Sequence, residues 1–455
     1  MNTSAAGLKM QWASPSDVTS ILMIIGGDVV QKALAQGTGK VYTPVCFSFG
    51  CVAYAFVSLV SIIGDGRLLP PPDYPAKVFN LDSGYQRENK NWVVGRILRD
   101  LESYLSRTDP IGDHGMRISV FEATLNMNGP ASFSWGRIHA AGALITVLQL
   151  ALAVVPIVLD REWTVMMIVV AGTFMVQITG WLPQWRAEKL PNRQRSNTAY
   201  ALTSGNGSRD VIVIFGRGYC LDLEELCASG SPRTSRPWEK FTLFSKPNTR
   251  NDGTQELLRR ESRCRGSINA YGLPMGFWIT KIMSGVLSVF WLLLLINVAA
   301  EKQHTWYLLG IGATGMFQNA WLAATETSSE RHNLPLILID TIKTQKVMDC
   351  LMDFQTSYQQ ARPLLKEFFP GRLRPLEEKW WYGQGDKDKD PYDAERRKDE
   401  IARGRPKRPV KNRFQPSSVM THGSSSFRQS PRKYFSSGQI GHHEARTYTS
   451  STDAT

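Results

Sequence analysis

A few polar side chains lie inside long apolar stretches of this sequence. Asp28, Gln31 and Lys32 interrupt one stretch, and Gln318 and Asn319 interrupt another. A carboxylate, an ammonium group and amides are costly inside a bilayer, and they often bind ions or relay protons there. These five residues are therefore the candidate intramembrane polar site of the chain.

Asp28 and Lys32 also admit a structural interpretation. They lie four residues apart, so on a helix they share one face and can form an ion pair. A neutralised pair that faces other helices, or a Lys32 stem that reaches the membrane surface, needs no transport function. We favour this interpretation, and the ion or proton site stays open beside it.

No other motif indicates catalysis. The 7 histidines form no cluster with a nucleophile, and the 6 cysteines lack the spacing of a zinc site. The strand-like residues 210–215 precede a Gly216-Arg217-Gly218 turn, but the Gly-Lys-Ser/Thr of a phosphate loop is missing. The GxGxxG at residues 310–315 lies in an apolar stretch and indicates close helix packing. We expect no catalytic residue, cofactor or metal.

Six apolar stretches must position the polar residues. Each is near the length of about 20 residues that a helix needs to cross a bilayer. Short connectors join them in pairs, which predicts a mainly α fold: a six-helix transmembrane bundle of three hairpins, at residues 17–64, 138–185 and 271–326. The stretches themselves are residues 18–34, 45–63, 138–159, 163–182, 276–300 and 306–325.

Two long polar segments, residues 65–137 and 186–270, separate the hairpins. The first contains an amphipathic helix at residues 94–105 and a strand pattern at residues 117–127, and the second contains the strand at 210–215. Because isolated strands are unstable, we expect the two segments to fold together as a small α+β cytosolic portion.

The ends of the chain are also polar. Residues 1–16 form a polar N-terminus, and residues 327–382 contain a second amphipathic helix at 347–358. Residues 383–455 are charged and then rich in serine, with few residues that could build a core. Their composition predicts a disordered basic tail.

The charge distribution predicts an orientation. The formal net charge is +13, and residues 186–270 alone carry 15 basic against 9 acidic residues. The short connectors around Lys40, Arg161 and Lys302 hold one basic residue each. Because basic residues near spans favour the cytosol, we expect both termini and both long segments there. This distribution also favours anionic lipid headgroups over nucleic acid as partners.

Several short motifs accompany the apolar stretches in a distinctive order. They are Ile118-Ser-Val-Phe-Glu122, Trp181-Leu-Pro-Gln-Trp185, Tyr200-Ala-Leu-Thr203, Gly205-Asn-Gly-Ser208, Phe368-Phe-Pro-Gly371 and Trp380-Trp381. In this order the chain resembles an uncharacterised group of fungal multi-pass membrane proteins, over roughly residues 40–382. The resemblance implies a multi-pass fold and no activity, ligand or site residue.

Three classes of function stay open. A membrane scaffold or sensor is favoured, because much of the chain is polar and its amphipathic helices suit cytosolic protein partners. A transporter or channel would use the polar residues of the first and sixth stretches. An enzyme is disfavoured, since no nucleophile and base are paired. The expected partners are the lipid bilayer, anionic headgroups and cytosolic proteins.

Overall fold

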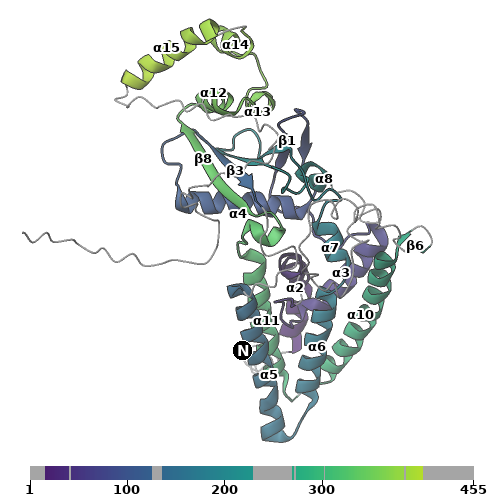
Figure 1. The fold of residues 1–455 in the computed structure, drawn as a ribbon. Coiled ribbons are helices and arrows are strands. Elements are labelled where there is room, and N and C mark those ends of the chain that lie inside the picture. Colours follow the sequence, from purple (N-terminus) through teal and green to yellow (C-terminus); the bar gives the residue numbers. More distant parts are fainter. Residues whose placement is uncertain are drawn as a thin grey trace, which may run out of the picture.

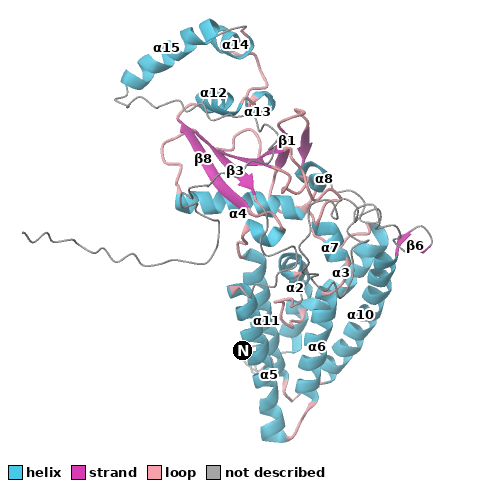
Figure 2. Cartoon of the chain, in the orientation of Figure 1, coloured by secondary structure: helices cyan, strands magenta, loops and turns pink. Residues whose placement is uncertain are grey.

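The chain folds into a helical bundle with a mixed β-sheet at one end (Figures 1 and 2). The structure is a computed structural model, and it describes residues 16–39, 42–124, 136–228, 269–270, 273–301, 303–383 and 386–402. Bundle and sheet together make a mainly helical protein. We call the end of the bundle beside the sheet the sheet end, and the opposite end the distal end.

Six of the described helices form the bundle. They are α2 (Ser16–Gly37), α3 (Gly50–Gly64), α5 (Arg137–Asp160), α6 (Thr164–Gly180), α10 (Met275–Ala300) and α11 (Thr305–Ala324). Among the described residues, three helices (α5, α6 and α10) are long and apolar enough to cross a membrane. This composition points to membrane association.

Each bundle helix packs against two others, so the helices close into a ring. The neighbouring pairs are α5–α6, α6–α10, α10–α3, α3–α2, α2–α11 and α11–α5. The turns between α5 and α6 and between α10 and α11 both lie at the distal end. There His304 Nε2 lies 3.8 Å from Asp160 Oδ2, which brings the two turns together.

The expected helix at residues 45–63 begins only at Gly50. Residues 43–48 form neither helix nor strand, Phe49 already has helical backbone angles as the N-cap of α3, and all seven residues are buried. Pro44 keeps Thr43 out of the helical region and supplies no N–H for a helix, while tertiary contacts satisfy the backbone that follows. Helix α3 is thereby shortened to 15 residues.

Helices α2 and α3 run in the same direction. The start of α3 at Gly50 contacts Gly26 in α2, and Gln31 further along α2 donates a hydrogen bond to the Leu68 carbonyl oxygen beyond the end of α3. Gln36, near the end of α2, reaches the Thr325 carbonyl oxygen at the sheet end. Residues 43–64 therefore enter the bundle at the sheet end and leave it there. We call them the re-entrant segment.

The sheet combines strands from distant parts of the chain. Its order is β2-β1-β4-β5-β3-β8. Strands β3 and β5 come from the two long polar segments and pair in parallel, which confirms that these segments fold together. The strands are β1 (Lys77–Asn80), β2 (Gln86–Glu88), β3 (Met116–Ala123), β4 (Ala199–Thr203), β5 (Asp210–Phe215) and β8 (Leu336–Thr344), and the short pair β6 (Asn269–Ala270) and β7 (Leu273–Pro274) lies apart.

Helices cover both faces of the sheet. On the bundle side, the amphipathic helix α4 (Trp92–Thr108) packs its apolar residues against one face, where Ile212 and Ile214 of β5 point. On the outer side, α12 (Val347–Tyr358) and α13 (Arg362–Phe368) cover the other face, with Val211 and Val213. Helix α14 (Pro375–Tyr382) packs outside them, where Trp381 donates to Met348 of α12. Both amphipathic helices expected from the sequence thus pack on the sheet.

The start of the expected disordered tail is helical. Helix α15 spans Asp386–Ala402, and its Arg396 binds Asp353 of α12 through two hydrogen bonds of 2.6 and 2.9 Å. These contacts order a charged segment that has few core residues of its own. Residues 403–455, the rest of the expected tail, lie outside the described residues.

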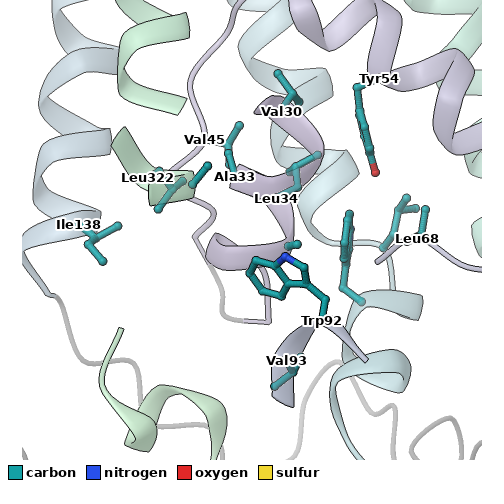
Figure 3. Packing of buried hydrophobic residues seen from close by; sticks show 14 of the residues in the cluster. Val30, Ala33, Leu34, Val45, Tyr54, Leu68, Trp92, Val93, Ile138 and Leu322 are labelled. Carbon is teal, nitrogen blue, oxygen red and sulfur yellow. The ribbon is translucent and has the colours of Figure 1, made fainter. Parts of the chain in front are cut away.

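One hydrophobic core runs from the bundle into the sheet domain. Leu34 of α2 and Leu68 beyond α3 gather near Trp92 at the start of α4, as Figure 3 shows. The short helices α7 (Gln184–Lys189), α8 (Leu223–Cys227) and η3 (Ser329–His332) surround this junction. The sheet domain is therefore packed against the bundle rather than tethered to it.

Candidate functional site

Side-chain amides hold residues 43–48, which form neither helix nor strand, inside the bundle. Asn319 of α11 receives a bond from the Cys46 N–H and donates one to the Cys46 carbonyl oxygen, both 2.9 Å. Gln177 of α6 bonds Thr43 in the same two-sided way, at 3.3 and 2.9 Å. Gln149 of α5 donates to the Phe47 carbonyl oxygen at 2.8 Å. The amides thus replace the neighbouring strand that an extended backbone would otherwise need.

Glycines make room for the extended residues. Gly172 of α6 and Gly312 of α11 face the rings of Phe47 and Phe49, and a Cβ on either glycine would lie 2.3 Å from the ring. A Cβ on Gly315 would lie 1.8 Å from the Phe47 carbonyl oxygen. Gly312 and Gly315 of the 310–315 motif thus make the close contacts that the sequence predicted, whereas Gly310 makes none. The Phe47 ring also stacks on Trp291 of α10, at 6.2 Å between centroids.

The structure distributes the five predicted polar residues over separate places. Asp28 is exposed and Lys32 is half-buried on α2. Gln31 binds the Leu68 carbonyl oxygen at 3.1 Å, whereas Asn319 binds Cys46 deeper in the bundle. Gln318 is buried, and its Nε2 has no hydrogen-bond partner among the described residues. Asn319 and Gln31 thus each hydrogen-bond the backbone of another segment.

Helix α7 binds the chain just beyond α3. The Glu188 carboxylate accepts hydrogen bonds from the Leu68 and Leu69 N–H groups at 2.8 and 2.7 Å, and another from Gln184 Nε2 at 2.7 Å. Burial raises the pKa of Glu188 to about 7, and these bonds oppose the rise. This carboxylate fixes where the re-entrant segment leaves the bundle.

The next residue of α7 binds the end of α2. Lys189 Nζ donates to the Thr38 carbonyl oxygen at 2.7 Å and to its hydroxyl oxygen at 2.8 Å. Burial lowers the pKa of Lys189 to about 7, against the opposing effect of Glu188. Burial also lowers the pKa of His332 to about 3, and the positive charges of Lys189 and Arg96 add to that shift. His332 is therefore neutral beside these cations.

Arginines of α4 cap the end of α11. Arg96 is 3% exposed; it donates to the Ala323 carbonyl oxygen at 2.9 Å and pairs with Asp73 at 2.5 Å. Arg99 pairs with Asp100, whose other oxygen accepts a bond from the Thr327 N–H at 2.9 Å. Guanidinium groups at a helix C-terminus satisfy free carbonyls and complement the helix dipole.

A cavity of about 560 Å³ lies at the same junction. It opens between the end of α3, α7, α8 and the start of α4. Its lining combines the apolar Val57 with Gln31, Asn89, Arg67, Lys90 and Glu188. The Nδ2 atom of Asn89 has no hydrogen-bond partner among the described residues. This volume is in the usual range of ligand pockets.

The part of the chain that the structure describes holds no group of three or more metal-ligating side chains. The cysteines described there are buried and form no disulfide with one another. No family model, curated protein or solved structure matches the chain. The resemblance to the fungal membrane proteins therefore stays a prediction.

The sequence reasoning missed Glu188, Lys189 and the cavity. The signal available was the Trp181-Leu-Pro-Gln-Trp185 motif directly after an apolar stretch, followed at Glu188 by a carboxylate one helical turn after Gln184. Their partners, Leu68 and Thr38, lie more than a hundred residues away in the chain. Such distant contacts leave no periodicity that a single sequence could reveal.

Proposed function

We propose that the chain is a multi-pass integral membrane protein that acts as a non-enzymatic platform. The bundle would lie in the bilayer and hold the sheet domain rigidly at the cytosolic face. The observation that carries this proposal is helix α4, which packs on the sheet with one side and caps α11 through Arg96. A domain fixed in this way can present a surface to other proteins in a constant orientation.

The proposed topology has five crossings: α2, α5, α6, α10 and α11. Helices α2 and α11 have 22 and 20 residues, enough to cross a bilayer. The re-entrant segment enters and leaves at the sheet end, so the N-terminus lies on the face opposite the sheet domain. Lys9 is the only basic residue before Ser16, which is compatible with an outside N-terminus. This topology replaces the six crossings and cytosolic N-terminus expected from the sequence.

Protease protection tests this topology. Sealed, right-side-out vesicles should lose an epitope tag placed before Met1 when protease is added outside, and should retain a tag placed after Thr455. The two tags on one chain serve as controls for each other. Protection of both tags would support six crossings with both termini in the cytosol. Loss of the C-terminal tag alone would show the opposite orientation.

An ion- or proton-coupled transporter is the second candidate. Extended backbone at membrane depth occurs in transporters, where it lines a substrate pathway. Here the amides of Asn319 and Gln149 are bound to that backbone, and Phe47 stacks on Trp291 beside it. These contacts support a sealed bundle and so favour the platform.

Replacing Asp28 and Lys32 together with leucine separates the two candidates. A platform should keep its abundance, its membrane and its ability to complement a deletion of its gene, because neither residue joins bundle to sheet. A transporter that uses these charges should keep abundance and location but lose complementation. The second outcome would reject the platform.

A further inference from the structure

The cavity at the junction has one wall that faces lipid. If the bundle lies in a membrane as proposed above, α3 presents Val57, Val60 and Ile63 to the acyl chains; their exposed fractions are 42%, 71% and 58%. Val57 also lines the cavity, together with Ser61 one turn later. An apolar strip on α3 thus leads directly into a polar cavity.

The charges around the cavity are mixed. Arg67 and Lys90 are basic, whereas Asp65, Glu188 and Glu225 are acidic. The three carboxylates would repel a purely anionic ligand, and the two basic groups would repel a purely cationic ligand. A ligand with both charges can pair with both sets.

Two residues that line the same cavity carry hydrogen-bond donors without a partner among the described residues. The Nδ2 atom of Asn89 and the Nε1 atom of Trp92 are buried without a partner among the described residues, and both residues line the cavity. Buried donors are normally satisfied. Phosphate and ester oxygens of a lipid headgroup are acceptors that suit them.

We propose that this cavity binds the headgroup of a zwitterionic, amine-bearing phospholipid from the leaflet on the sheet side. The phosphate lies near Lys90, Arg67 and Asn89, and the ammonium group lies near Asp65 and Glu225. One acyl chain follows the exposed strip of α3 into the bilayer. The inference rests on the membrane placement proposed above.

Lipid retention by the purified full-length protein tests the site. The protein is exchanged into mixed micelles that hold equal amounts of phosphatidylethanolamine and phosphatidylglycerol, and native mass spectrometry counts the lipids retained. The wild-type protein should retain one phosphatidylethanolamine in preference to phosphatidylglycerol. Lys90→Ala should lower that retention about tenfold, as expected for one lost charge-assisted hydrogen bond. Lys366→Ala, at an exposed position in α13, should retain lipid as the wild-type protein does.

A gain of binding excludes misfolding as the cause. Asp65→Asn removes a carboxylate from the cavity, so it should raise the retention of phosphatidylglycerol. Millimolar inorganic phosphate should leave the retained lipid in place, because phosphate lacks the acyl chain and the amine. Equal retention of both lipids by the wild-type protein, no effect of Lys90→Ala, or displacement by phosphate would each overturn the site. Release of the protein from membranes by alkaline carbonate would instead reject the membrane placement itself.

Discussion

Glu188 and Lys189 are neighbours in sequence, yet they do not satisfy each other. Glu188 binds the backbone after α3, and Lys189 binds the backbone after α2. Burial favours the neutral form of each group, so it raises the pKa of Glu188 and lowers the pKa of Lys189, to about 7 in both cases. The contribution of Glu188 to stability therefore falls as the pH rises, whereas the contribution of Lys189 increases with pH.

Replacement of Glu188 by glutamine should flatten the pH dependence of stability between about pH 4.5 and 7. The folded state raises the pKa of this carboxyl from 4.5 to about 7, so it binds the proton more tightly than the unfolded state does. The contribution of Glu188 is therefore most favourable below pH 4.5 and declines as the pH rises to 7. Thermal unfolding in detergent across this range measures the slope for the wild-type protein and the variant.

Glu378→Gln is the matched control for this experiment. Glu378 is exposed on α14, so its replacement should leave the slope unchanged. The midpoint of Glu188→Gln is also expected to fall, because a glutamine can accept only one of the two backbone bonds. A slope equal to that of the wild-type protein would show that Glu188 does not titrate in this way.

At the residue scale, the sequence identified Asn319 as notable but not its role. An amide in an apolar helix is costly without a partner, and that fact alone singled it out. Its partner is the backbone of Cys46, which carries no distinguishing side-chain signal. Glu188 was not identified because a carboxylate in a polar segment is ordinary until the fold buries it.

The re-entrant segment shows how packing overrides local preference. Residues 45–63 form a mainly apolar run without a charged residue, and by composition such a run is typical of a helix. The first residues are extended because Asn319, Gln149 and Gln177 satisfy their backbone and glycines admit their rings. Only Pro44 in the sequence indicates a break, and proline is equally common in the first turn of a helix.

Gly315→Ala should destabilise the bundle by about 1–3 kcal/mol, the usual cost of overpacking. The new Cβ would meet the Phe47 carbonyl oxygen and, at 2.6 Å, Gln149 Nε2. The extended backbone would have to shift and lose its bond to Gln149. Unfolding in mixed detergent micelles gives the free energy difference from the wild-type protein.

Gly310→Ala on the same helix provides the control. A Cβ at Gly310 would meet nothing within 4 Å. Since alanine is the better helix former by about 1 kcal/mol, this variant should be unchanged or slightly more stable. If both variants behaved alike, the close approach of Phe47 to α11 would be refuted.

Sheet and bundle depend on each other through α4. Arg96 is buried and joins Asp73, Trp92 and the end of α11. Arg107, on the same helix, reaches Glu326 beyond α11 from an exposed position. The two arginines therefore offer a comparison of buried and exposed contacts across one interface.

Arg96→Leu should destabilise the whole protein by about 1–3 kcal/mol, because it leaves the buried Ala323 carbonyl at the end of α11 without its partner, whereas the exposed Asp73 can be hydrated. Arg107→Leu should cost at most about 1 kcal/mol, as is usual for exposed pairs. Calorimetry of the purified protein measures both. The Arg96 variant should also separate the unfolding of sheet and bundle into two transitions. A single transition at the wild-type midpoint would contradict the proposed coupling.

At the scale of the whole molecule, the sequence predicted that the two polar segments fold together, but not how their strands pair. The alternating pattern at residues 117–127 and the continuous apolar strand at 210–215 predicted a common sheet, because isolated strands are unstable. The parallel pairing of β3 with β5, and the addition of β8 from beyond α11, depend on where the bundle places the ends of its helices. Helix α15 was missed because its order comes from contacts with α12 rather than from its own composition.

The amides that receive residues 43–49 have a consequence for the order of synthesis. Asn319 emerges from the ribosome 270 residues after Phe49, a delay of roughly 15–50 s at usual rates of translation. Gln149 and Gln177, the partners of Phe47 and Thr43, are made earlier, but Cys46 has no backbone partner until Asn319 appears. If the bundle lies in lipid as proposed, such unpaired groups are not tolerated there. On that proposal, this segment would wait outside the bilayer or under the cover of another protein until then. One of the first segments to be made is thus among the last to reach its place.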